Sequence, residues 1–124
     1  MEDIKERFKS KADLVSAEIK GILKTHGNKK VGEVTLSQIY QGMRGMTGLV
    51  TETSLLDSAE GIRFRGYSIP DLQKKLPKAK AGDEPLPEGL FYLMLMGELP
   101  EPSDVELVTS IWQRRSHVPN YVFD

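Results

Sequence analysis

Gly42-Met43-Arg44-Gly45-Met46-Thr47-Gly48-Leu49-Val50 is the stretch around which this chain of 124 residues can be interpreted. Glycine recurs there at every third position, and each glycine inside a helix costs about 1 kcal/mol relative to alanine. We therefore predict a loop, with Arg44 as its one cation. The segment Leu49 to Ser54 begins with apolar and β-branched residues, which predicts a strand leaving the loop.

A second strand is predicted over Gly61 to Tyr67. The turn-forming residues from Asp57 to Gly61 precede it, so the two strands are expected to pair as a small antiparallel hairpin. Alternation places Arg63 and Arg65 on one face of the second strand. That face could bind an anionic ligand, or it could be solvated and paired with the carboxylates that lie close by in the sequence: Glu52, Asp57 and Glu60.

Toward the N-terminus, a long helix is predicted over residues 2–25. His26-Gly27-Asn28 supplies its stop signal, because glycine and asparagine adopt the left-handed conformation and histidine suits the negative end of the helix dipole. His26 could be a ligand or a base, but no second histidine or carboxylate cluster lies near it in the sequence, so we interpret it as a capping or solvated residue. Val31 to Leu36 alternates, which predicts a short strand and a β region extending over 31–67. The apolar residues of the helix recur at steps of three and four: Ile4, Phe8, Ala12, Val15, Ile19, Ile22 and Leu23.

Three further helices are predicted toward the C-terminus, over residues 69–76, 87–97 and 103–116. Ser68 and Asp71 form a capping-box pattern for the first of them. The second contains an apolar run from Leu90 to Met96 and is therefore expected to be buried on every side. The third is expected to begin at a cap on Ser103 and to bury three side chains: Leu107, Ile111 and Trp112. His117, which follows it, is interpreted as a surface residue.

The composition excludes several classes of function. Net charge is -1, from 17 basic and 18 acidic residues, which argues against nucleic acid as a partner. The sequence contains no cysteine, so disulfides, thiolate metal sites and cysteine nucleophiles are ruled out, and no metal site is predicted. The longest apolar run is far shorter than the roughly 20 residues that a membrane span needs. The first residues mix acids with bases, unlike a transit peptide, so we expect the mature part of any imported parent protein.

Four motifs then resemble, in order and spacing, the N-terminal region of eukaryotic, mitochondrial-type citrate synthase. They are Gly42 to Val50, Glu52 to Ser54, Glu60 to Pro70, and Glu84 to Leu90. The resemblance extends over essentially the whole chain from about residue 20 onward. It implies a mainly α fold with a small antiparallel β-hairpin, in which residues 1–124 are an incomplete, N-terminal portion of the large domain.

The resemblance also implies a homodimeric acyltransferase of the tricarboxylic acid cycle in the mitochondrial matrix. Such an enzyme condenses acetyl-CoA with oxaloacetate to give citrate and CoA, and it needs no permanently bound cofactor. The two histidines and the aspartate that catalyse this reaction in the family lie downstream of the matched region, and neither His26 nor His117 matches them. The chain alone is therefore expected to contain no catalytic residue and to be inactive.

The resemblance further implies that Arg44 lies at the CoA site and contacts the nucleotide phosphates. A guanidinium group stays charged and can meet phosphate oxygens as a fork. Gly42 and Gly45 would let the backbone approach the ligand closely. As an alternative, Arg44 could pair with a carboxylate across a subunit contact.

Two functional hypotheses follow. In the first, the chain is a fragment of a citrate synthase, and the biochemical function belongs to the complete enzyme. In the second, it is a non-catalytic structural or accessory subunit, derived from citrate synthase, within a larger mitochondrial assembly. In both, the apolar helix around Leu93 predicts that the chain associates with itself, with the rest of a subunit or with another partner.

Overall fold

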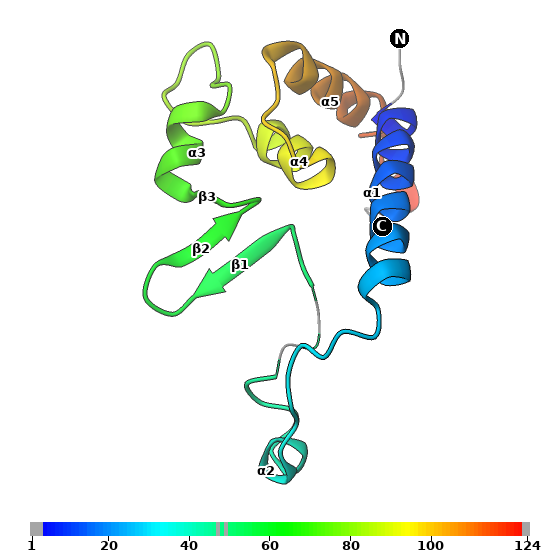
Figure 1. The fold of residues 1–124 in the computed structure, drawn as a ribbon. Helices are drawn as coiled ribbons and strands as arrows, with labels where there is room; N and C mark the ends of the chain where they lie inside the picture. The colour runs from blue at the N-terminus through cyan, green and yellow to red at the C-terminus, as the bar shows by residue number, and fades with distance from the viewer. Residues whose placement is uncertain (1–3, 47, 49, 123–124) are drawn as a thin grey trace. The chain divides into compact units, whose positions relative to one another are not determined.

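The computed structural model describes residues 4–46, 48 and 50–122 (Figure 1). Two compact units divide the chain. One combines the first turns of α1, up to Phe8, with the segment from Glu52 onward, and the other runs from Lys9 to Thr51. The helices are α1 (Ile4–His26), α2 (Leu36–Tyr40), α3 (Ile69–Lys75), α4 (Pro87–Met96), α5 (Pro102–Arg114) and the 3-10 helix η1 (Asn120–Val122); the strands are β1 (Ser54–Asp57), β2 (Gly61–Phe64) and β3 (Tyr67–Ser68).

The strands form one antiparallel sheet in the order β1-β2-β3, so a mainly helical fold with a small antiparallel β element is confirmed. Two predicted strand boundaries are wrong. The first strand begins at Ser54 rather than at Leu49, and Leu49 lies outside the described residues. The second ends at Phe64, because Arg65 and Gly66 adopt positive φ angles of 49° and 86° and turn the chain into β3. Arg65 therefore does not share a strand face with Arg63.

The turn between β1 and β2 is held by Asp57, as its residue type suggested. The Asp57 Oδ1 atom accepts hydrogen bonds from the backbone N–H groups of Ala59 at 2.8 Å and Glu60 at 2.9 Å. These bonds favour the charged carboxylate and hold the pKa of Asp57 below its ordinary value. The hairpin turn is thus fixed by a side chain that mimics a backbone acceptor.

Helix caps position α3 and α5. The predicted capping box of α3 is confirmed: Ser68 Oγ accepts from the Asp71 N–H, and Asp71 Oδ2 accepts from the Ser68 N–H, each at 3.3 Å. The predicted cap of α5 on Ser103 is wrong. Glu101 is the N-cap, and Asp104 accepts from the Glu101 N–H at 3.0 Å. Pro102 begins the helix because its fixed φ suits the first helical position, so Ser103 lies inside α5.

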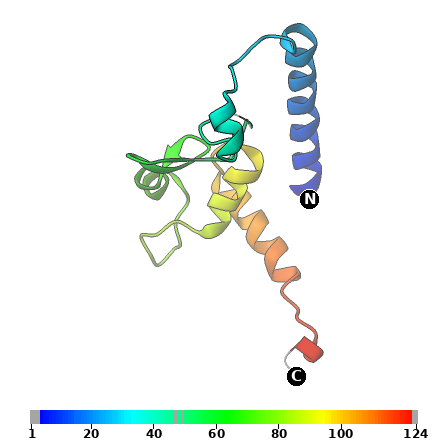
Figure 2. The same ribbon diagram turned by 90° about the horizontal axis from the view of Figure 1, so that it is seen from below.

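In the unit that contains the residues from Glu52 onward, the core surrounds α4. This helix packs beside α5 in both ribbon views (Figures 1 and 2). Leu93 is fully buried, yet Phe91 on the same helix remains 38% exposed, so the expectation of burial on every side is wrong for this chain. On α5 the buried residues are Val105 and Val108, whereas Trp112 is exposed. Two buried clusters make up the core: Leu72, Leu76 and Leu93, and Tyr92, Met96 and Val108.

An ion pair fastens the first turns of α1 to this core. Arg7 Nη1 lies 2.7 Å from Asp104 Oδ1 and donates to the Tyr92 hydroxyl at 3.3 Å. Burial raises the pKa of the Tyr92 phenol, and the hydrogen bond from Arg7 opposes that shift. Asp104 therefore serves two elements at once, since its other oxygen caps α5.

In the second unit, α1 runs to His26, one residue past its predicted end at 25, and its predicted first residues 2 and 3 lie outside the described residues. Side chains of its apolar stripe are exposed there, among them Ile19, Ile22 and Leu23. The strand predicted over Val31 to Leu36 is wrong. Thr35 Oγ1 accepts from the Gln38 N–H at 3.3 Å, while the Thr35 N–H donates to Gln38 Oε1 at 3.0 Å. This capping box begins α2 instead, so the predicted β region over 31–67 starts only at Ser54.

Candidate functional site

The glycine-rich segment is a loop of turns, as predicted, and it begins where α2 ends. The Gln41 N–H closes the helix on the Ser37 oxygen at 3.0 Å. The Met43 N–H then reaches back to the Gln38 oxygen at 2.7 Å, and the Met46 N–H bonds the Met43 oxygen at 3.2 Å. Thr47 and Leu49, which complete the motif, lie outside the described residues.

Positive φ angles explain the glycines. Gly42 and Gly45 both have φ of 73°, a conformation that costs other residues about 1 to 2 kcal/mol. A Cβ atom placed at either position would meet no described atom within 4 Å. Backbone conformation, rather than tight packing within this chain, therefore requires glycine here, and the space beside both residues is open. Met43 between them also has a positive φ, of 61°.

Arg44 lies between these two glycines, and its side chain is exposed. Within the described parts of the chain, its guanidinium makes no hydrogen bond or ion pair. The structure thus brings the three predicted site residues into a single loop, with a charged group projecting from a backbone that glycine keeps open. A guanidinium in such a setting can donate several hydrogen bonds to an oxyanion.

A cavity of about 330 Å³ lies next to this loop, and sequence reasoning missed it. Gly45 and Met46 form one side of it, and Gln38 of α2 contributes a polar group. The Thr35-to-Gln38 capping pattern was the signal that could have placed α2 here. Glu33, another lining residue, pairs with Lys30. The remaining lining residues are Val31, Gly32 and Val34.

The other candidate side chains have structural partners or lie at exposed ends. His26 is the last residue of α1, and His117 lies in the exposed segment after α5. Arg63 binds Glu60 through Nη2 at 2.7 Å, and Arg65 Nη1 lies 3.7 Å from Glu52. The salt-bridged interpretation of the two arginines is therefore the one that the structure supports.

The described residues contain neither a cluster of metal ligands nor a membrane-spanning helix. No three or more histidine, aspartate or glutamate side chains among them gather closely enough to hold a metal ion. In the same part of the chain, none of the helices combines the length and the apolar character needed to cross a membrane.

Comparison with known proteins gives a consistent result. A family model described as "Citrate synthase, C-terminal domain" matches residues 42–124. The chain is 51% identical over 114 residues to a protein of Kajikia audax named "Citrate synthase, mitochondrial", covering 90% of this chain and 24% of that protein. A protein of the same name from Emericella nidulans is 50% identical over 119 residues, covering 96% of this chain and 25% of that protein. One from Xiphias gladius is 50% identical over 114 residues, covering 90% of this chain and 24% of that protein. The chain spans about a quarter of the length of these curated relatives.

Proposed function

This chain belongs to the citrate synthase family, and we propose that it forms part of a subunit that condenses acetyl-CoA with oxaloacetate to give citrate and CoA. The observation that carries the proposal is the identity of about half of all aligned residues, over at least 90% of the chain, with proteins named mitochondrial citrate synthase. The same names support a mitochondrial location. We further propose that the complete subunit forms a homodimer.

Within that subunit, Arg44 is proposed to bind the phosphates of CoA. Its exposed guanidinium, without a partner in the described residues, supports this role, as do the positive φ angles of Gly42 and Gly45. Phosphate oxygens are the acceptors that a guanidinium fork suits best. Acetyl-CoA is a substrate that this loop would help to hold, and no permanently bound cofactor is needed.

The chemistry of condensation is proposed to come from the rest of the subunit. Removing a proton from the acetyl methyl group requires a positioned base, and the developing enolate oxygen requires hydrogen-bond donors. His26 at the end of α1 and His117 in the segment after α5 are both exposed, and neither has a hydrogen-bonded carboxylate among the described residues that would orient it. The contribution of this chain is therefore binding and not proton transfer.

The test uses a complete chimeric subunit in which these 124 residues replace the homologous quarter of the Emericella nidulans protein. The chimera is expected to release CoA from acetyl-CoA only when oxaloacetate is present. Replacing Arg44 by alanine should raise the KM for acetyl-CoA roughly 10- to 100-fold, since a charge-assisted hydrogen bond contributes about 1.5 to 3 kcal/mol. The KM for oxaloacetate should change less than about twofold.

Arg114→Ala is the matched control, because Arg114 is also an exposed arginine but lies at the end of α5. An unchanged KM for acetyl-CoA in Arg44→Ala would reject the phosphate contact. A folded chimera that shows no condensation at all would reject the assigned reaction.

A further inference from the structure

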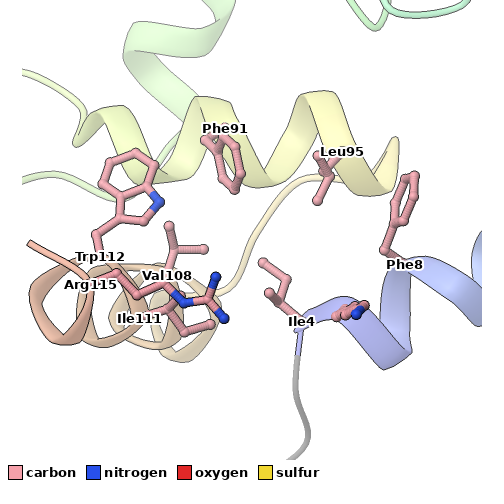
Figure 3. A pocket seen from close by; sticks show the side chains of 9 residues that line it. Ile4, Phe8, Phe91, Leu95, Val108, Ile111, Trp112 and Arg115 are labelled. Atoms are coloured by element: carbon pink, nitrogen blue, oxygen red, sulfur yellow. The ribbon is translucent and has the colours of Figure 1, made fainter.

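A second, larger pocket, of about 410 Å³, lies in the unit that joins the first turns of α1 to the segment from Glu52 onward. Figure 3 shows side chains from three helices directed toward it. Its lining is mainly apolar, with two cations. The lining residues are Ile4, Lys5 and Phe8 of α1, Phe91 and Leu95 of α4, and Val108, Ile111, Trp112 and Arg115 of α5 and the position after it.

Two aromatic residues at this pocket are left incompletely buried. Phe91 and Trp112 pack edge to face with their ring centroids 5.3 Å apart, yet they remain 38% and 39% exposed. Apolar surface left in water forgoes the stabilisation that its burial would give. An apolar pocket lined by aromatic side chains is typical of a binding site. The pocket therefore favours an apolar occupant.

The positive charge of Arg115 indicates that the occupant carries a carboxylate. The Arg115 guanidinium lines the pocket, and among the described residues it has no hydrogen-bond or ion-pair partner. An apolar group that covered the pocket without a carboxylate would desolvate this cation with no compensation. A second copy docked pocket to pocket would bring two Arg115 side chains together, because a two-fold contact pairs identical patches, and like charges would repel.

We infer that this pocket seats an apolar helix face, bordered by a carboxylate that pairs with Arg115, from the remaining three quarters of a citrate synthase subunit. The length of the relatives that lies outside this chain, about three quarters of each, supplies the occupant. The lining comes from three helices, and a fourth helix would complete a layer of helix-on-helix packing. The inference rests on the proposed function only in assigning the chain to such a subunit.

The absence of cysteine makes a direct test possible, since a single introduced thiol is the only one contributed by this chain. Three variants are compared, in the isolated 124-residue chain and in the chimeric subunit, by alkylation with iodoacetamide followed by peptide mass spectrometry. Ile111→Cys reports on the pocket. Val108→Cys, at a position 1% exposed, reports whether this unit is folded, and Ser58→Cys reports on the exposed hairpin turn.

The Ile111→Cys thiol is expected to react at least about tenfold more slowly in the chimera than in the isolated chain, because burial blocks the reagent. The Val108→Cys thiol should be protected in both, and the Ser58→Cys thiol in neither. Equal reactivity of Ile111→Cys in the two proteins would overturn the inference. Protection in the isolated chain that disappears on dilution would identify a second copy as the occupant and would also overturn it.

A second experiment compares charge reversal at Arg115 with charge reversal at the neighbouring Arg114. In the chimera, Arg115→Glu is expected to unfold at a lower urea concentration than Arg114→Glu, while Arg115→Lys should stay close to the wild type. Equal urea midpoints for the two glutamate variants would overturn the carboxylate pairing. An active chimera with a reactive Ile111→Cys thiol would reject this inference alone. An inactive chimera with that thiol protected would reject the proposed function alone.

Discussion

Arg65 donates two hydrogen bonds to the main-chain oxygen of Met94, from Nε at 3.2 Å and from Nη2 at 2.7 Å. Met94 lies in the last turn of α4, where backbone oxygens lack partners within the helix. The backbone N–H of Arg65 also donates to the Thr53 oxygen at 2.8 Å. Arg65 thus joins three elements: the segment before β1, the turn after β2, and the C-terminal end of α4.

Replacing Arg65 separates the side-chain bonds from the backbone conformation. Arg65→Ala should lower the free energy of unfolding by about 1.5 to 3 kcal/mol, because it removes charge-assisted hydrogen bonds. Arg65→Gly should be about 1 kcal/mol more stable than Arg65→Ala, since glycine accepts the φ of 49° without strain. Urea unfolding followed by circular dichroism measures both variants. An alanine variant as stable as the glycine variant would contradict the conformational argument.

Asp71 gives the stability of the chain a defined dependence on pH. Hydrogen bonds from Ser68 hold the pKa of the Asp71 carboxyl below its ordinary value. A carboxyl whose pKa is lower in the folded state contributes stability above its unfolded pKa and loses it as the pH falls through the folded pKa. Asp71→Asn keeps an acceptor but cannot titrate, so its urea midpoint should fall less steeply than that of the wild type below about pH 4.

The control for this experiment is Asp83→Asn, at an exposed aspartate without a hydrogen bond or ion pair among the described residues. It should retain the acid sensitivity of the wild type. Parallel pH profiles for the wild type and Asp71→Asn would contradict the linkage.

Asp104 serves both Arg7 and the start of α5, so its removal should be more harmful than removal of Arg7. Arg7→Met breaks the ion pair but leaves the cap, whereas Asp104→Ala loses both. Asp104→Ala should therefore be less stable than Arg7→Met by about 1 kcal/mol, the usual contribution of an N-terminal cap. When Arg7→Met is added to Asp104→Ala, the free energy of unfolding should fall by less than when Arg7→Met is made in the wild type. Full additivity of the two losses would show that the pair is not coupled.

The isolated chain is expected not to release thiol from acetyl-CoA in the presence of oxaloacetate. The physical reason is that a binding loop without a positioned base and hydrogen-bond donors does not lower the barrier to proton abstraction. A thiol-trapping assay on homogeneous protein measures this, and the chimeric subunit is its positive control. Sustained turnover by the 124-residue chain would place catalytic groups within it.

Local signals predicted the helices well because their causes are local. The stripe of α1 and the Ser68–Asp71 cap depend only on spacing along the chain. Where two local patterns compete, the sequence is ambiguous: the alternation over Val31 to Leu36 suggests a strand, but the Thr35–Gln38 cap forms a helix. The start of β1 depends on β2, because Ser54 pairs with Phe64 and the chain turns at Arg65. The residues from Leu49 to Thr53 contain no local signal for that boundary.

Burial on α5 was mispredicted for a tertiary reason. Leu107, Ile111 and Trp112 are the larger side chains, but α4 packs against the face that carries Val105 and Val108. The loop conformation at Gly42 and Gly45 agrees with the glycine pattern, and the binding role of Arg44 stays a prediction. The larger pocket was not predicted because its lining residues lie far apart in sequence. The smaller one is lined by residues between Val31 and Met46, and it was missed because the first part of that segment suggests a strand.

Ser68 ends β3 and caps α3, so the sheet passes into the helix without a connecting loop. Because no linker separates β3 from α3, neither element can unfold alone: losing the strand pairing of Ser68 also removes the cap of α3. In native-state hydrogen exchange, the amides of β2 and α3 should therefore open with one common free energy, as a single cooperative unit. The hairpin and α3 are in that sense one piece of the fold.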